Sequence, residues 1–295
     1  MDQSDMRLTG VYPPLITPTE RRGTVDTESL AEHVKTLQEC GINGFFPCGT
    51  AGEFASLTHD QRRQTIETVR HEVPESTVLA GCGGTAVGSV VKQIEQAKKI
   101  GADAAVVIAP YYLDPTPNGL RAYFRNILNE AQLPIILYNI PHLTKCRIPV
   151  DLVTKLAKDE QVVGIKDSSG DPRYHWRLLA ETPSEFSVLQ GITDQAVSSL
   201  RAGGDGIVPG VANVIPEPVL ELFYACERDD YDHALEIHEE TFSPLLNALT
   251  EVPLAAGLKY ILREQGLDIG YPLPPLSQLS DEQQVPIDEW IRTSN

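Results

Sequence analysis

The chain has 295 residues, of which 41% are hydrophobic, so it can bury a sizeable core in a single α/β barrel. Its 41 acidic and 24 basic residues give a formal net charge of −17, which argues against binding to nucleic acid or to an anionic membrane surface, because both need a basic patch. The acidic residues are scattered through the expected helices rather than gathered in a tail, as is typical of solvated helix faces.

Short apolar strands alternate with amphipathic helices from the start of the chain. Apolar runs predict strands at residues 11–16, 44–47, 78–80, 104–108, 135–138, 162–166, 186–189 and 206–208. Apolar residues at helical spacing predict helices at residues 29–37, 59–73, 87–100, 119–131, 150–158, 174–181 and 195–202. For the first of these helices we expect Thr27 to be the N-cap and Gly41 to mark the end.

This alternation predicts eight strand–helix units and therefore a parallel sheet closed into a (β/α)8 TIM barrel, an α/β fold. A doubly wound open sheet is the alternative, because periodicity alone does not distinguish a closed sheet from an open one. Three more helices are expected at residues 217–226, 231–249 and 253–265. Since no linker divides the chain, we expect one structural unit, with the barrel at 1–211 and a C-terminal three-helix extension at 212–295.

The sixth expected strand ends in a lysine, and a small, polar turn follows it. Because side chains alternate along a strand, Lys166 shares a face with Val162 and Gly164 and projects from a mostly apolar strand. Two interpretations fit this position: a structural ion pair, or an amine whose pKa is lowered by desolvation so that it acts as a nucleophile. The strand by itself favours the ion pair, since structural ion-pair networks also hold lysines.

Polar residues follow other strands at the same end of the expected barrel, where the site of such a fold lies. Thr50 and Ala51 belong to a small-residue turn after the second strand, whose backbone N–H groups suit a carboxylate. Tyr112 follows the fourth strand, and Tyr138 ends the fifth. A tyrosine beside a lysine at neighbouring strand ends makes an acid–base and nucleophile pair, which favours the nucleophilic interpretation of Lys166.

A series of short motifs extends over nearly the whole chain. They are Gly-Thr-Ala-Gly-Glu at 49–53, Pro-Tyr-Tyr at 110–112, Tyr-Asn-Ile-Pro at 138–141, Gly-Ile-Lys-Asp at 164–167, Gly-Gly-Asp-Gly-Ile at 203–207, Gly-Val-Ala-Asn at 210–213, the lysine-containing stretch 253–266 and Pro-Leu-Pro-Pro-Leu at 272–276. In these motifs the chain resembles the dihydrodipicolinate synthase/N-acetylneuraminate lyase superfamily of class I, Schiff-base aldolases.

The resemblance implies roles for four residues. Lys166 would form the Schiff base with the 2-oxo carbon of pyruvate or another 2-oxo acid, and Tyr138 would move the proton of the hydroxyl at the reacting bond. Thr50 would orient Tyr138 and, with the Ala51 backbone N–H, the substrate carboxylate. Tyr112 matches a tyrosine that many members receive from a neighbouring subunit, and the superfamily implies a homotetramer built as a dimer of dimers. Neither a cofactor nor a metal is expected.

The acceptor end of the site departs from the synthases that condense pyruvate with aspartate semialdehyde. Where those enzymes carry an arginine for the aldehyde's carboxylate, this chain has Leu143, as in the lyase and sugar-acid branches; Ala51 also replaces their second threonine. Gly191, Thr193 and Asp194 follow the seventh strand and would hold a polyol tail. The residues expected to bind substrate are thus Thr50, Ala51, Leu143, Gly191, Thr193, Asp194, Gly210 and Val211.

These differences favour an aldolase that cleaves a 2-keto-3-deoxy sugar acid, such as 2-keto-3-deoxygluconate, to pyruvate and an aldehyde. The alternatives within the superfamily are 4-hydroxy-tetrahydrodipicolinate synthase, N-acetylneuraminate lyase and a sugar-acid dehydratase. A non-catalytic 2-oxo acid sensor on the same scaffold is the alternative from another class, although a sensor needs no nucleophile and proton-transfer pair.

Two other site types and the cellular setting complete the sequence evidence. Gly81-Cys82-Gly83-Gly84-Thr85-Ala86 fits a dinucleotide-binding fingerprint, but the acid at the expected distance, Asp103, precedes a strand instead of ending one. The histidines show no metal-ligand spacing.

The cysteines are odd in number and widely spaced, and no signal segment or membrane span is evident, so we expect a cytoplasmic protein. The acidic surface would suit a high-salt cytoplasm.

Overall fold

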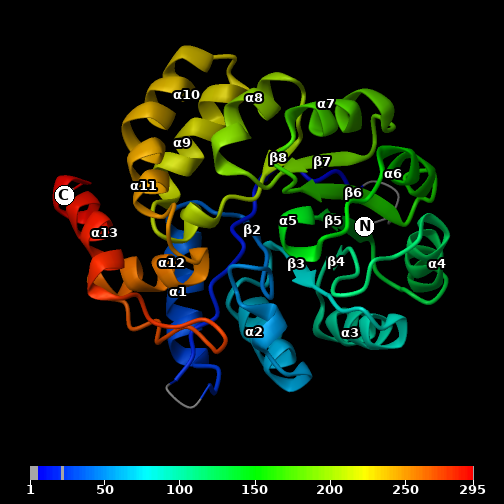
Figure 1. Cartoon of the computed structure of the whole chain (residues 1–295), viewed down its shortest axis with the longest axis horizontal. Coiled ribbons are helices and arrows are strands. Elements are labelled where there is room, and N and C mark those ends of the chain that lie inside the picture. Colours follow the sequence, from blue (N-terminus) through cyan, green and yellow to red (C-terminus); the bar gives the residue numbers. More distant parts are fainter. Residues whose placement is uncertain (1–5, 21–22, 295) are drawn as a thin grey trace.

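Eight parallel strands form the centre of the computed structural model, which describes residues 6–20 and 23–294 (Figure 1). The strands are β1 (Gly10–Val11), β2 (Gly44–Phe45), β3 (Thr77–Gly81), β4 (Ala104–Ile108), β5 (Ile135–Asn139), β6 (Val162–Asp167), β7 (Ser187–Gln190) and β8 (Gly206–Ile207). They are hydrogen-bonded in the order β1-β8-β7-β6-β5-β4-β3-β2.

The two edge strands of this order meet and close the sheet. Pro14 and Phe46 form a parallel bridge, in which the Leu15 N–H donates to the Phe46 carbonyl at 2.9 Å and the Phe46 N–H donates to the Pro13 carbonyl at 3.1 Å. The predicted TIM barrel is therefore confirmed, and the open sheet is excluded. The first strand is shorter than expected, because Pro13 and Pro14 have no N–H to continue a ladder.

Helices surround the strands on the outside of the barrel (Figure 1). The wall consists of α1 (Thr27–Glu39), α2 (His59–Glu72), α3 (Val87–Ile100), α4 (Pro117–Leu128), α6 (Val150–Leu156), α7 (Pro172–Glu181), α8 (Ala196–Arg201) and α9 (Pro216–Glu227). Asp26, not Thr27, caps α1, because its carboxylate accepts hydrogen bonds from the N–H groups of Glu28 and Ser29.

The loops at the C-terminal ends of the strands contain short helical turns. They are η2 (Phe54–Ser56), α5 (Pro141–Thr144), η3 (Thr193–Gln195) and η4 (Gly210–Asn213). A Cβ on Gly81, at the end of β3, would lie 2.0 Å from the Cys48 carbonyl oxygen. Close packing between neighbouring strand ends thus accounts for the first glycine of the dinucleotide-like stretch.

The C-terminal extension is helical, as expected, but its members differ. It contains α10 (Tyr231–Ile237), a π-helical turn η5 (His238–Phe242), α11 (Ser243–Ala248), α12 (Leu254–Glu264) and α13 (Asp281–Ser294). The sequence did not predict α13. Helix α9, the first helix after residue 211, packs against α8 and β1.

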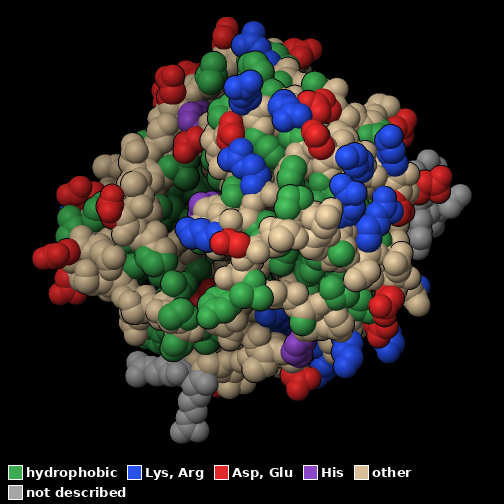
Figure 2. Space-filling view, turned by 45° about the vertical axis from the view of Figure 1, so that its right-hand side comes forward, with side chains coloured by type: hydrophobic (Ala, Val, Ile, Leu, Met, Phe, Trp, Pro, Cys, Tyr) green, Lys and Arg blue, Asp and Glu red, His purple; other side chains and the backbone are tan. Residues whose placement is uncertain are grey.

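On the face drawn in Figure 2, acidic side chains occur all over the surface, whereas the basic ones gather towards the top and right of the view and are absent from its left edge. In the described part of the chain no helix has the length and hydropathy needed to cross a membrane.

Candidate active site

Lys166 lies at the C-terminal end of β6 and is 4% exposed. Burial lowers the pKa of its amine from 10.5 to about 7. Within residues 6–20 and 23–294 no carboxylate comes within ion-pair distance of it, so a structural ion pair does not explain this lysine. A substantial share of the amine is therefore neutral near pH 7 and able to attack a carbonyl carbon.

Tyr138 lies beside the lysine because β5 and β6 pair in register at these two residues. The Lys166 Nζ atom is 4.4 Å from the centroid of the Tyr138 ring and 4.9 Å from that of Phe46. The phenol oxygen is 3.1 Å from the Thr50 Oγ1 atom. Burial raises the Tyr138 pKa to about 12, partly offset by hydrogen bonds from Thr50 and Ser168, so the group is a neutral phenol that can exchange protons along these bonds.

A buried ion pair fixes the turn that carries Thr50. Glu53 has a left-handed backbone, with φ of 54°, and its Oε1 atom is 2.6 Å from the Nζ atom of Lys259 on α12. Its Oε2 atom accepts a hydrogen bond from the Leu273 N–H at 2.6 Å, and Lys259 also donates to the Tyr271 carbonyl at 2.9 Å. The extension thus holds the 49–53 turn against the barrel mouth.

Gly191 is needed for space rather than for a hydrogen bond. A Cβ at this position would lie 2.1 Å from the Ser168 Oγ atom and 2.9 Å from the Lys166 Cε atom. Any larger residue would displace the reactive lysine or the serine behind it.

A cavity of about 410 Å³ opens above these groups. It is lined by Pro14, Thr50, Ala51, Tyr138, Ile140, His142, Leu143, Lys166, Ser168, Gly191, Ile192, Val208, Gly210, Pro253, Leu254, Ala255 and Leu276. A second pocket of about 290 Å³ shares Thr50, Leu143 and Leu276 with it. The wall is mostly apolar, with its polar groups gathered around Lys166.

The structure brings together Lys166, Tyr138, Thr50, Ala51, Leu143, Gly191 and Gly210 of the residues expected in the site. The other four lie elsewhere. Val211 is buried but does not line the cavity. Thr193 begins η3, and the mostly exposed Asp194 carboxylate lies 3.7 Å from His238 Nε2, outside the cavity. Tyr112 is 95% exposed, with φ of 76°.

Sequence reasoning missed two groups in the cavity wall. Ser168 directly follows β6 and hydrogen-bonds Tyr138, and its position two residues after Lys166, on the same face of the chain, was the available signal. The stretch Pro253–Ala255 and Leu276 come from the extension; the motifs containing them were noticed, but nothing local showed that they reach the barrel mouth.

These groups provide a partly neutral amine, a neutral phenol beside it, and the hydroxyls of Thr50 and Ser168, which hydrogen-bond the phenol. His, Cys, Asp and Glu side chains form no group of three or more that could hold a metal ion, as far as the described residues extend. The arrangement suits covalent chemistry on a carbonyl compound.

Comparisons with known proteins agree with this chemistry. The profile of the dihydrodipicolinate synthetase family matches residues 7–293. A 4-hydroxy-tetrahydrodipicolinate synthase of Methanopyrus kandleri is 35% identical over 283 residues, which cover 94% of this chain and 93% of that protein.

Solved structures show the same similarity. Dihydrodipicolinate synthase from Aquifex aeolicus superposes with a TM-score of 0.94 at 31% identity, covering 98% of both chains. A prophage protein of E. coli, from the dihydrodipicolinic acid synthase family and crystallised with pyruvate, gives a TM-score of 0.91 at 27% identity, covering 98% of this chain and 99% of that one. None of these three relatives is named a 2-keto-3-deoxygluconate aldolase, and the two enzyme names favour the synthase alternative.

Proposed function

Because the chain belongs to the dihydrodipicolinate synthetase family and is thereby a pyruvate-dependent carbon–carbon lyase of the class I aldolases, we propose that it cleaves a 2-keto-3-deoxy sugar acid to pyruvate and an aldehyde. Lys166 is the Schiff-base residue in this proposal. Its support is a buried amine with a pKa of about 7 beside a neutral phenol.

The cavity wall supports an aldehyde that carries no carboxylate of its own. Leu143 lines the cavity, and among the described lining residues Lys166 is the only lysine or arginine. A substrate with a second carboxylate would bring it into an apolar wall without a charge-assisted partner, which is costly. This single observation carries the choice of substrate class. Since Thr193 and Asp194 do not line the cavity, we assign the polar contacts of the tail to Ser168 and His142.

The reaction follows from the positions of three groups. The Lys166 amine attacks the 2-oxo carbon, and loss of water leaves a protonated imine. The hydroxyl on C4 gives its proton to the Tyr138 oxygen, Tyr138 passes its own proton to the Thr50 oxygen along the 3.1 Å contact, and Thr50 releases its hydroxyl proton to solvent in the cavity, from which a proton later returns to C3. The C3–C4 bond breaks, the aldehyde leaves, and the electron pair forms an enamine on the imine. Protonation at C3 and hydrolysis then release pyruvate and free the amine.

A second candidate is 4-hydroxy-tetrahydrodipicolinate synthase, which condenses rather than cleaves. The name of the Methanopyrus kandleri relative favours it. The same imine and enamine serve both directions, so Lys166 and Tyr138 keep their roles and only the acceptor differs.

A substrate comparison decides between the two. The purified protein is assayed for pyruvate release from 2-keto-3-deoxygluconate and related sugar acids, and separately for condensation of pyruvate with aspartate semialdehyde. Faster release from a sugar acid supports the first candidate. Condensation at an equal or higher kcat/KM would overturn it in favour of the synthase.

We also propose that the active unit is a homotetramer. Tyr112 and Leu113 are 95% and 65% exposed and do not line the cavity of their own chain, so both side chains are accessible to a neighbouring subunit. Light scattering of the parent and of Tyr112→Asp tests this: dissociation of the variant is expected, and a monomeric parent would contradict the proposal.

A cytoplasmic location is proposed as well, supported by the free thiols of all five cysteines.

A further inference from the structure

Behind the lysine strand, three buried polar residues are hydrogen-bonded in a row. Asp167 ends β6, His175 lies on α7 and Ser199 lies on α8, and each is 1% exposed. The His175 Nδ1 atom is 3.1 Å from Asp167 Oδ2, and the His175 Nε2 atom is 2.8 Å from Ser199 Oγ. The row therefore connects two helices of the barrel wall to the strand that carries Lys166.

The partners define which ring nitrogen donates to the strand. The Asp167 carboxylate accepts, so the imidazole donates from Nδ1, and Nε2 is left for the bond with the Ser199 hydroxyl. A Ser–His–Asp row is also the arrangement of a hydrolase triad. Here complete burial keeps a substrate away from Ser199, and a Cβ on Gly204 would lie 2.4 Å from its Oγ atom. The row is thus a packed structural link.

Asp167 joins this row to the two reactive residues. Its Oδ1 atom accepts a hydrogen bond from Asn139 Nδ2 at 3.0 Å, and Asn139 Oδ1 accepts from the Ile148 N–H at 3.0 Å. Asn139 directly follows Tyr138, and Asp167 directly follows Lys166, in paired register. Because side chains alternate along a strand, the Asn139–Asp167 bond lies on the opposite side of the sheet from the phenol and the amine.

We propose that His175 is a positioning residue that sets the separation between the Tyr138 phenol and the Lys166 amine. Together with the N–H and hydroxyl of Ser169, which donate to the same carboxylate from the adjoining turn, it holds Asp167 against Asn139; His175 is the donor that comes from the helix layer, and the Asn139–Asp167 bond fixes the ends of β5 and β6 relative to each other. This inference rests on the proposed Schiff-base function. Imine formation needs only the Lys166 amine, so it should survive loss of the link. Proton transfer needs the Lys166 amine and the Tyr138 phenol at the right separation, so it should become slower.

Two partial reactions of pyruvate separate these steps without any acceptor aldehyde. Borohydride reduction of the imine at Lys166, followed by mass spectrometry, reports imine formation alone. Exchange of the C3 hydrogens of pyruvate in deuterium oxide, followed by NMR, reports the imine–enamine step: a proton leaves C3, the enamine forms, and a deuteron from solvent returns to C3.

His175→Leu removes both hydrogen bonds, whereas the amide of His175→Asn can still donate to Asp167. We expect His175→Leu to slow C3 exchange at least about tenfold while it is still trapped by borohydride, and His175→Asn to stay within about threefold of the parent. Ser199→Ala leaves the His175–Asp167 bond in place and should slow C3 exchange less than His175→Leu does. If His175→Leu does not fold, Ser199→Ala is measured in its place.

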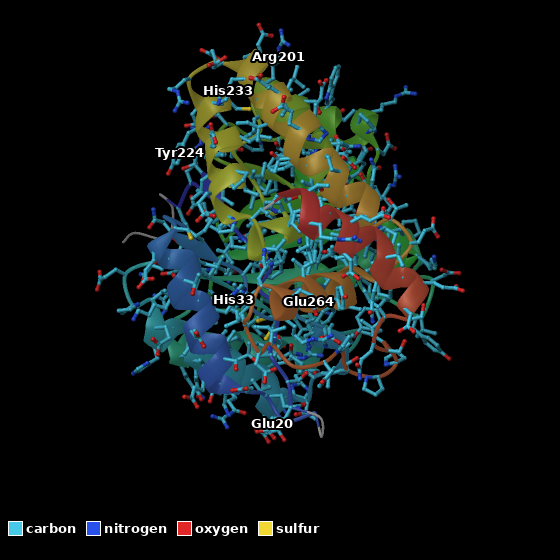
Figure 3. All side chains as sticks on the ribbon, turned by 90° about the vertical axis from the view of Figure 1, so that its left-hand side faces the viewer. Glu20, His33, Arg201, Tyr224, His233 and Glu264 are labelled. Atoms are coloured by element: carbon cyan, nitrogen blue, oxygen red, sulfur yellow. The ribbon has the colours of Figure 1, made fainter. Side chains whose placement is uncertain are left out.

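His33→Leu is the matched control, because His33 on α1 (labelled in Figure 3) is equally buried and bonds to Asn213 rather than to Asp167. His33→Leu should lower the stability of the protein, but it should not slow C3 exchange relative to borohydride trapping. Equal exchange in His175→Leu and the parent, or equal loss of trapping and exchange, would overturn the positioning role. Failure of the parent itself to be trapped would overturn the proposed function and this inference with it.

Discussion

The Nζ atom of Lys166 lies 4.4 Å from the ring centroid of Tyr138, and the two residues face each other in register on β6 and β5. The aromatic rings of Tyr138 and Phe46 and the surrounding apolar strands exclude water from the amine. The same contacts that desolvate the amine thus place it beside the phenol to which we assign the proton transfer.

Replacing Lys166 should abolish turnover and leave the fold intact. In Lys166→Met the side chain keeps its length but loses the nucleophile, so we expect kcat to fall by at least about 10³-fold. Borohydride with pyruvate should label the parent and not the variant. Lys259→Met is the matched control, since Lys259 is also buried but pairs with Glu53, and this variant should still be labelled at Lys166. Undiminished turnover in Lys166→Met would refute the Schiff-base mechanism.

The rate of imine formation should rise with pH through about 7 and then level off, because the attacking form of Lys166 is the neutral amine. The pKa of this lysine is lower in the folded state than its ordinary value of 10.5. Between these values the unfolded chain binds more protons, so this residue's contribution to stability rises with pH across that window. Denaturant unfolding of the parent and Lys166→Met at several pH values should show the variant's advantage shrinking from pH 7 to 10.

Tyr138→Phe should separate imine formation from bond cleavage. Without the phenol hydroxyl, kcat should fall about 10²–10⁴-fold, the usual effect of losing general acid–base catalysis. Trapping of pyruvate at Lys166 should persist. Tyr123→Phe, which removes another buried hydroxyl that bonds to the Gly84 carbonyl outside the cavity, should keep kcat close to that of the parent. A Tyr138→Phe enzyme as fast as this control would exclude the phenol from catalysis.

Breaking the Glu53–Lys259 pair should destabilise the protein. Both side chains are almost fully buried, at 2% and 0% exposure, so removing one leaves the other charge without a partner. We expect Glu53→Gln and Lys259→Met each to cost about 3–5 kcal/mol in urea unfolding. The double variant should cost less than the sum of the two, because neither charge then remains unpaired. Strict additivity would show that the pair contributes no coupling.

Leu143→Arg should shift activity towards an aldehyde that carries a carboxylate. Leu143 lines the cavity, and a guanidinium there can bind a carboxylate with two charge-assisted hydrogen bonds. The ratio of condensation with aspartate semialdehyde to cleavage of a sugar acid should rise at least about tenfold. Leu143→Met controls for side-chain length. An unchanged ratio in the arginine variant would show that position 143 does not select the acceptor.

Local patterns in the sequence determined the strand–helix alternation and the family, and they singled out Lys166, Tyr138 and Thr50, which the fold brings to one cavity. The spacing of apolar residues that distinguishes a strand from a helix involves residues close together in the chain, so it can be read from the sequence before the fold is known. The motifs around these residues are short and contiguous, so they can be recognised in the sequence, and their order along the chain indicated the family.

Only the tertiary structure decided which distant segments complete the site. The Pro14–Phe46 bridge closes the sheet, Lys259 reaches Glu53 from α12, and Leu254 and Leu276 enter the cavity wall, whereas Thr193 and Asp194 do not line it. These contacts join residues far apart in the chain, and they depend on how the helices pack on the barrel. The local sequence does not determine this packing, because a residue type at a given spacing can point into the cavity or out of it, depending on how its loop is packed.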